Sequence, residues 1–286
     1  MSECRLCPRN CLVDRKKKTG YCGCTDEIKI AKYMLHFGEE PCISGKNGSG
    51  AIFFSGCSLR CVFCQNYPIS HELKGETVNE DRFTEIMYEL RDKGAHNINF
   101  VTGTHYADKI ADVLKKHKKN LGIPIVYNCG GYENIETLKM LDGLVDIFLP
   151  DMKYYSTEMS AKYSGAQDYF EKALPALREM IRQQPKAVFD DNGIMHSGVI
   201  VRHLVLPKGY HDSMKILDEI AAFPVRPLVS IMRQYTPCYD AYKFPEINRK
   251  LTTFEYEKVT EYCADLGLDG FMQEKGCENL DMTPDF

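Results

Sequence analysis

Residues 51–66, AIFFSGCSLRCVFCQN, carry the most informative motif of the chain. The run Ala51–Phe54 is short and apolar, which predicts a buried β-strand. Cys57, Cys61 and Cys64 follow it with the spacing C-x3-C-x2-C. Three thiolates within eight residues of one loop can wrap one corner of a [4Fe-4S] cluster, which normally takes four cysteines. One iron would therefore stay open to a ligand that the protein does not supply.

Other interpretations of this loop fit its spacing less well. Structural zinc needs four closed ligands, usually as two separated pairs. A bacterial ferredoxin would show C-x2-C-x2-C-x3-C-P, which this chain lacks. Three buried cysteines without any metal are the remaining alternative, and a loop directly after a strand disfavours it.

Beyond the loop, the sequence predicts strands that alternate with helices. Apolar runs predict further strands at 97–101, 125–127, 145–149, 199–206 and 228–232, and a short closing strand at 270–273. The first helix is expected over 80–93, with Thr77 and Glu80 at the spacing of a capping box. A longer helix around 170–181 contains Pro175, which should kink or split it. Such alternation implies parallel βαβ units, hence an α/β fold.

Composition excludes several classes of protein. The 286 residues are 44% hydrophobic and 27% charged with a net charge of −4, which is ordinary for a globular protein. No apolar run approaches the ~18 residues that cross a bilayer, and MSECRLCPRN lacks the apolar region of a signal peptide. The charge balance gives no reason to expect a nucleic acid or an anionic membrane as partner. We expect a cytoplasmic location, where clustered cysteines bind metal or run thiol chemistry.

The N-terminus has a second group of cysteines. Residues 1–45 have few periodic apolar residues, so we expect an irregular, metal-binding segment rather than a segment that folds by burial. Four thiols within nineteen residues can close a zinc site or bind a second iron–sulfur cluster, and the sequence leaves both open. The expected ligands are Cys4, Cys7, Cys11 and Cys22, with Cys24 as a spare.

The loop cysteines, with an aromatic residue before the last of them, resemble the signature of radical S-adenosylmethionine (SAM) enzymes. The wider stretch FFSGCSLRCVFCQNYPIS (53–70) resembles the branch that includes the pyruvate formate-lyase activating enzyme. The likeness covers nearly the whole chain, because further stretches resemble the same branch: HFGEEPCISGKNGSG (36–50), YNCGGYENIETLKMLDG (127–143), DIFLPDMKY (146–154), VRHLVLPKG (201–209) and EINRKLT (246–252).

The resemblance implies that Cys57, Cys61 and Cys64 hold a [4Fe-4S] cluster whose open iron binds SAM. An electron from the cluster would cleave SAM to methionine and a 5′-deoxyadenosyl radical, which abstracts hydrogen from the substrate. With the strand pattern, it predicts a partial (βα)6 TIM-like barrel over residues 46–286, open on one side, with residues 1–45 as a small Cys-rich extension.

The resemblance also implies partners. A low-potential electron donor of the flavodoxin or ferredoxin type would supply the electron, and an activase-like protein would act on a glycine of a glycyl radical enzyme. A radical SAM enzyme that modifies a small molecule or a short peptide is the alternative. From another class, a non-catalytic metal-binding interaction protein would also carry such cysteines.

Polar residues at the ends of predicted strands are candidates for SAM contacts, because functional residues of a barrel lie at the C-terminal ends of its strands. An Asp-x-Lys at the matching position contacts SAM in activating enzymes, although a strand-end salt bridge is the alternative for this pair. Many family members carry Gly-Gly-Glu after the second strand, where this chain has Thr-Gly-Thr, so that assignment is by position alone. The predicted contacts are Thr102, Gly103, Asn128, Asp151, Lys153 and Arg202.

Overall fold

A computed structural model describes residues 3–276 and 284–286 of the chain. The backbone forms one sheet with the strand order β10-β9-β8-β6-β5-β4-β2-β1-β3, and β7 pairs with β8. Seven neighbouring strands run parallel to one another. They are β2 (Ser49–Phe54), β4 (Ile98–Val101), β5 (Ile125–Cys129), β6 (Ile147–Pro150), β8 (Met195–Leu204), β9 (Leu228–Met232) and β10 (Gly270–Met272).

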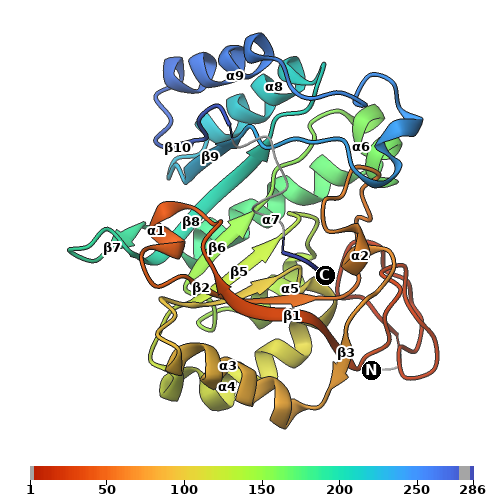
Figure 1. The fold of residues 1–286 in the computed structure, drawn as a ribbon, viewed down its shortest axis with the longest axis vertical. Helices are drawn as coiled ribbons and strands as arrows, with labels where there is room; N and C mark the ends of the chain where they lie inside the picture. The colour runs from red at the N-terminus through yellow and green to blue at the C-terminus, as the bar shows by residue number, and fades with distance from the viewer. Residues whose placement is uncertain (1–2, 277–283) are drawn as a thin grey trace.

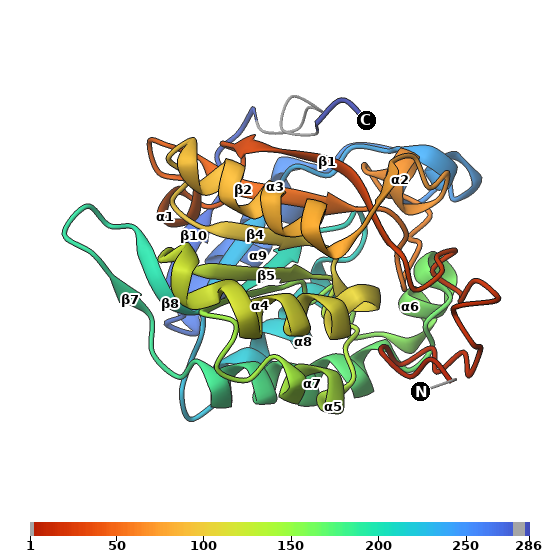
Figure 2. The same cartoon turned by 90° about the horizontal axis from the view of Figure 1, so that it is seen from below.

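Helices cover the outer face of this sheet (Figures 1 and 2). They follow the parallel strands in turn, as βαβ units require. Within the described residues the path of strands ends at β10 and β3 without closing. The predicted α/β class and open, partial barrel are therefore confirmed. The larger helices are α3 (Glu80–Asp92), α4 (Ala107–Leu121), α5 (Ile135–Met140), α6 (Thr157–Ser164), α7 (Tyr169–Gln183), α8 (Tyr210–Ala221) and α9 (Thr253–Asp265).

Three strands were not predicted. The strand β1 (Ile28–His36) pairs antiparallel with β2, and β3 (Glu76–Val78) pairs antiparallel with β1; β7 (Val188–Phe189) is an exposed edge beside β8. Most side chains of β1 are partly buried on both faces, so it lacks the alternation that marks a half-buried strand. The expectation of irregular structure is thus wrong for residues 28–36, whereas the division at residue 45 stays a prediction.

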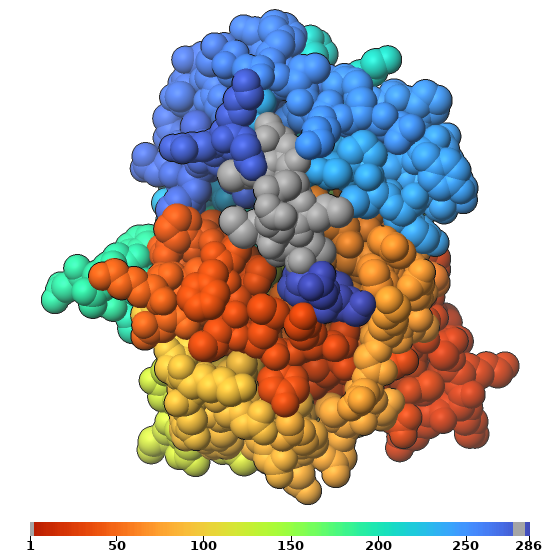
Figure 3. Space-filling model, in the orientation of Figure 1, coloured from red at the N-terminus to blue at the C-terminus, as the bar shows by residue number. Residues whose placement is uncertain are grey.

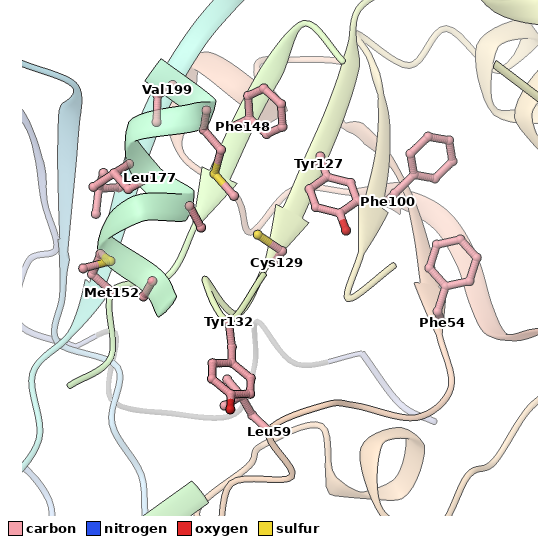
Figure 4. Packing of buried hydrophobic residues seen from close by; sticks show 14 of the residues in the cluster. Phe54, Leu59, Phe100, Tyr127, Cys129, Tyr132, Phe148, Met152, Leu177 and Val199 are labelled. Carbon is pink, nitrogen blue, oxygen red and sulfur yellow. The ribbon is translucent and has the colours of Figure 1, made fainter. Parts of the chain in front are cut away.

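Alternation along β2 divides its side chains between two layers. Phe54 packs outward against Phe83 of α3, with ring centroids 5.9 Å apart, in the main core between sheet and helices (Figure 4). Phe53 faces the other way, in a small cluster with Ala51 and Val101. Fully burying one such ring contributes about 1.5–3 kcal/mol. The six-residue strand is thereby fixed in register before the cysteine loop begins.

The capping box expected at Thr77 and Glu80 was wrong, and the split that was the other expectation for Pro175, besides a kink, does not occur. The N-cap of α3 is Asn79, whose side chain accepts a hydrogen bond from the Arg82 amide, whereas Thr77 belongs to β3. Helix α7 continues through Pro175 without being split. Its apolar face is buried along the whole length, with Ala173 and Leu177 on either side of the proline, and this packing outweighs the one lost hydrogen bond.

Short elements complete the fold: α1 (Pro41–Ser44), α2 (Tyr67–Ser70), η1 (Thr104–Tyr106) and η2 (Tyr239–Lys243). Residues 285 and 286 lie against β1 and β2 (Figure 3). The Lys32 ammonium of β1 donates to the carbonyl of Asp285 (2.7 Å), and the ring of Phe286 is 5.4 Å from that of Phe53 on β2. Over the described ranges, 3–276 and 284–286, no helix has the length and apolar character to span a membrane.

Candidate active site

The cysteine motif lies on a tightly bent loop that follows β2. Gly56 opens the loop with φ of 88°, and a Cβ at this position would lie 2.8 Å from the carbonyl oxygen of Cys22, so no side chain fits. Arg60 also has a positive φ, 50°, which is costly for a residue with a long side chain. Such strain is typical of functional loops.

The three thiols face one another and each accepts a hydrogen bond. Burial raises the pKa of Cys64 to about 12, and the neighbouring Cys61 and Cys57 thiols contribute to the rise. A bound metal deprotonates a coordinating thiol outright, and hydrogen bonds to sulfur tune such ligands. The donor set therefore fits an iron–sulfur cluster. The hydrogen bonds run from Leu59 N to Cys57 Sγ (3.4 Å), from Ser164 Oγ to Cys61 Sγ (3.0 Å) and from Ser70 Oγ to Cys64 Sγ (3.3 Å).

The loop opens onto a cavity of about 610 Å³ inside the open barrel. This volume is in the range of small-molecule and cofactor sites. The cavity brings the loop cysteines together with five of the six residues predicted to contact SAM. Its lining includes Cys57, Cys61, Cys64, Thr102, Asn128, Asp151, Lys153 and Arg202.

Asp151 is the centre of a buried network of charges in this cavity. Its carboxylate accepts from the Lys153 ammonium (2.6 Å) and from Arg202 Nε (3.1 Å). Burial alone would raise the pKa of Asp151, but the Lys153 and Arg202 cations hold it below its usual value. The strand-end salt bridge considered for Asp151 and Lys153 is thus present, at the wall of a cavity that could also hold a ligand.

Sequence reasoning missed Glu39, which is an equal member of this network. Its carboxylate accepts from Arg202 Nη1, Asn128 Nδ2 and Asn99 Nδ2, each at 3.0 Å. Glu39 lies in the loop between β1 and α1, 163 residues from Arg202 in the chain. The stretch 36–50 stands out in the sequence only through its resemblance to the activating enzymes, because adjacent acids in a loop have no periodicity that would predict burial.

Thr102 and Gly103 differ in their placement. Thr102 lines the cavity with φ of 60°, unusual for a β-branched residue, and its amide donates to the carbonyl of Asn128 (2.8 Å). Gly103 is not part of the lining. A Cβ at Gly103 would lie 2.7 Å from Ile110 Cδ1, so the glycine allows η1 to pack closely on α4.

The N-terminal cysteines gather beside the cysteine loop. Cys11 Sγ and Cys22 Sγ both lie 3.6 Å from the Cβ position of Gly20. Burial raises the pKa of Cys7 to about 12, with the Cys22 and Cys11 thiols among the further causes. Cys4 is close to the same group, since its thiol and that of Cys22 both act on the pKa of one buried arginine.

Contacts between the N-terminal segment and the barrel are specific. Arg9 donates to the carbonyl oxygens of Ser58, within the cysteine loop, and Ser164, both at 2.8 Å. Cys24, the spare cysteine, donates to the carbonyl of Ser55 (3.2 Å) directly before Gly56. The segment therefore buttresses the loop that carries Cys57.

A site for a single metal ion differs from a site for an iron–sulfur cluster. In the part of the chain that the structure describes, no group of three or more His, Cys, Asp or Glu side chains is arranged to hold a metal ion. A [4Fe-4S] cluster does not require that arrangement, because each of its cysteines binds a different iron atom.

Comparisons with known proteins agree with this geometry. The model of the radical SAM superfamily matches residues 51–203. The chain is 33% identical over 276 residues to the uncharacterized protein MJ0674 of Methanocaldococcus jannaschii, which covers 93% of this chain and 75% of that protein. Two solved structures share the fold at low identity. SuiB of Streptococcus suis bound to SAM has a TM-score of 0.54 at 14% identity, over 80% of this chain and 50% of SuiB. Methylornithine synthase (PylB) has a TM-score of 0.52 at 15% identity, over 79% and 72%.

The chain belongs to the radical SAM superfamily. Membership implies a [4Fe-4S] cluster, SAM and an enzyme that uses them for radical chemistry, which also requires a reductant. The matched range begins in β2 and ends in β8, so it includes the cysteine loop and all the residues predicted to contact SAM.

Proposed function

We propose that this protein activates a glycyl radical enzyme, by cleaving SAM reductively and abstracting a hydrogen atom from a glycine of that partner. The observation that carries the proposal is the single cavity in which three hydrogen-bonded thiols meet the Asp151 network. The sequence likeness to activating enzymes over most of the chain supports the choice of a glycine as substrate. A flavodoxin- or ferredoxin-type donor would deliver the electron.

Each part of the cavity has a role in this proposal. Cys57, Cys61 and Cys64 hold the cluster, which with bound SAM supplies an electron and a 5′-deoxyadenosyl radical. Asp151 accepts a hydrogen bond from the ribose or the amino group of SAM, and the Lys153 ammonium pairs with the carboxylate of SAM. The apolar wall keeps water from the reacting atoms.

Other polar residues of the lining hold this arrangement in place. Arg202 keeps Asp151 ionised, and Asn128 binds Arg202 through its side-chain oxygen (2.6 Å). Thr102, with its positive φ, lies beside Asn128 and donates its amide to the carbonyl of that residue. Gly103 lets η1 pack on Ile110, and its contact with SAM stays a prediction.

A second metal centre is part of the proposal. Cys4, Cys7, Cys11 and Cys22 would bind zinc or a second iron–sulfur cluster, and residues 1–45 would fold around it. The proximity of these thiols to one another supports a metal centre; they are not arranged around one ion in the described residues, which favours a cluster over zinc because each cysteine of a cluster binds a different iron. Zinc would be structural, whereas a cluster could pass electrons toward the cysteine loop.

The principal test replaces the three loop cysteines with alanine. The Cys57→Ala, Cys61→Ala, Cys64→Ala variant should form no 5′-deoxyadenosine from SAM under anaerobic reduction by dithionite. The control is Cys263→Ala, because Cys263 is buried on α9 away from the cavity. Undiminished nucleoside from the triple variant would refute the assignment of the cluster.

The alternative substrate is a small molecule or a short peptide, which the cavity volume of about 610 Å³ supports. A second experiment separates the two. Incubation with SAM, reductant and a glycyl radical enzyme should give the electron paramagnetic resonance signal of a glycyl radical in the partner. Cleavage of SAM without that signal, for the cognate partner, would favour the smaller substrate.

A further inference from the structure

A second acid, Glu40, lies next to Glu39 in the loop between β1 and α1. It occupies the N-cap position of α1, yet its side chain makes no capping hydrogen bond. A carboxylate at that position is normally stabilised by the free amides of the first turn. Glu40 instead lines the cavity and is only 8% exposed.

Glu40 has no ion-pair partner of its own in the described part of the chain. Its Oε2 is buried without a hydrogen-bond partner, and burial raises the pKa of the carboxyl although the Arg202 charge and a hydrogen bond with Ser230 act in the opposite direction. A buried carboxyl of this kind is costly unless a ligand pairs with it.

Arg202 is shared among three other side chains and forms no hydrogen bond or ion pair with Glu40. Its Nη1 binds Glu39, its Nη2 binds Asn128 and Asp151, and its Nε binds Asp151. Two cations, Arg202 and Lys153, balance the two carboxylates Glu39 and Asp151. Glu40 is the carboxyl left over, at the floor of the cavity.

The position of Glu40 indicates which molecule it faces. The cysteine loop follows the C-terminal end of β2, whereas Glu40 belongs to the loop beside its N-terminal end, where His36 of β1 pairs with Ser49. A strand of six residues separates the two loop backbones by about 20 Å. SAM binds at the cluster, so the floor is left for the substrate.

We propose that Glu40 binds a positively charged group of the substrate, an ammonium or a guanidinium, at the floor of the cavity opposite the cysteine loop. This inference rests on the proposed function, because it assumes that the substrate enters the barrel beneath SAM. The cation supplies the missing counter-charge.

The test measures the binding of small probes by calorimetry, on anaerobically reconstituted protein saturated with SAM. The probes are n-butylammonium, n-butylguanidinium and the neutral valeramide, which have similar size. Both cations should bind at least about tenfold more tightly than valeramide, and Glu40→Gln should remove about tenfold or more of that affinity. The matched control is Glu133→Gln. Glu133 is also a buried acid, but it is satisfied by Thr104 and Tyr127 and lies outside the cavity lining.

Each outcome decides the proposal. Equal binding of valeramide and the cations by the native protein overturns it without any variant, and so does an unchanged cation affinity in Glu40→Gln. Cations that bind only without SAM, in competition with it, would show that Glu40 recognises the positive charge of SAM instead. Formation of 5′-deoxyadenosine by the native protein is measured separately, so failure of the proposed function is told apart from failure of this inference.

Discussion

Replacing Asp151 with Asn should weaken SAM binding while the cluster still assembles. The substitution keeps the shape of the side chain but removes the charge that Lys153 and Arg202 share. Loss of one charged hydrogen bond to SAM costs about 1.5–3 kcal/mol, so the dissociation constant should rise by about tenfold or more. Equilibrium binding of SAM to anaerobically reconstituted protein measures this directly.

The same substitution should also lower the free energy of unfolding. Arg202 keeps Glu39 as a partner at 3.0 Å, but within residues 3–276 and 284–286 the Lys153 ammonium is paired with Asp151 alone. Removing one partner of a buried pair costs about 3–5 kcal/mol. The side-chain oxygen of the new asparagine can still accept from Lys153, so we expect a loss near the lower end of this range.

Urea unfolding of the Asp151→Asn variant gives this second quantity. Glu136→Gln is the control, because Glu136 and Lys139 form an exposed pair whose loss should not be measurable. Unchanged SAM affinity together with lost stability would show that Asp151 is only a structural salt bridge, and the reasoning about the site would be refuted.

Two further predictions concern the N-terminus and pH. Replacing Cys4, Cys7, Cys11 and Cys22 by alanine should make the N-terminal segment sensitive to proteolysis before the barrel. Metal analysis of the native protein should find about eight irons, or about four irons plus one zinc, per chain. Four irons, no zinc and an N-terminus protected from proteolysis would contradict this prediction. Burial lowers the pKa of His203 to about 4, while the unfolded chain takes up that proton near 6.5. Stability from this group is therefore full above about pH 6.5 and falls as pH decreases toward 4, by about 2 kcal/mol at pH 5; His203→Gln should flatten the dependence of the urea midpoint on pH, and an unchanged slope would exclude this cause.

The fold could be predicted where the apolar pattern was strong. Every parallel strand was expected within a few residues, since a buried strand is a short apolar run between turns. The strand Ile28–His36 was not predicted, because most of its side chains are partly buried on both faces and no alternation marks it. Helix α7 passes through Pro175 because tertiary packing decides that segment, which local propensity cannot show.

The site could be predicted where spacing or strand ends gave a signal. The loop cysteines and Asp151 were found in this way, and the cavity brings them together. Glu39 and Glu40 could not be found, because their importance arises from burial against residues distant in the chain. Gly103 was assigned to SAM by position alone, and that assignment stays a prediction; the close contact with Ile110 is one reason for a glycine there.

The hairpin of β1 and β2 has a consequence for substrate size. One continuous stretch of chain supplies the acids of the floor and then, after six residues of β2, the thiols at the other end. Lengthening β2 by two residues would deepen the cavity by about 7 Å and leave every side chain on its present face. A change of one residue would instead exchange the layers in which Phe53 and Phe54 lie. Relatives that act on longer or shorter substrates are thus expected to differ in this hairpin by even numbers of residues.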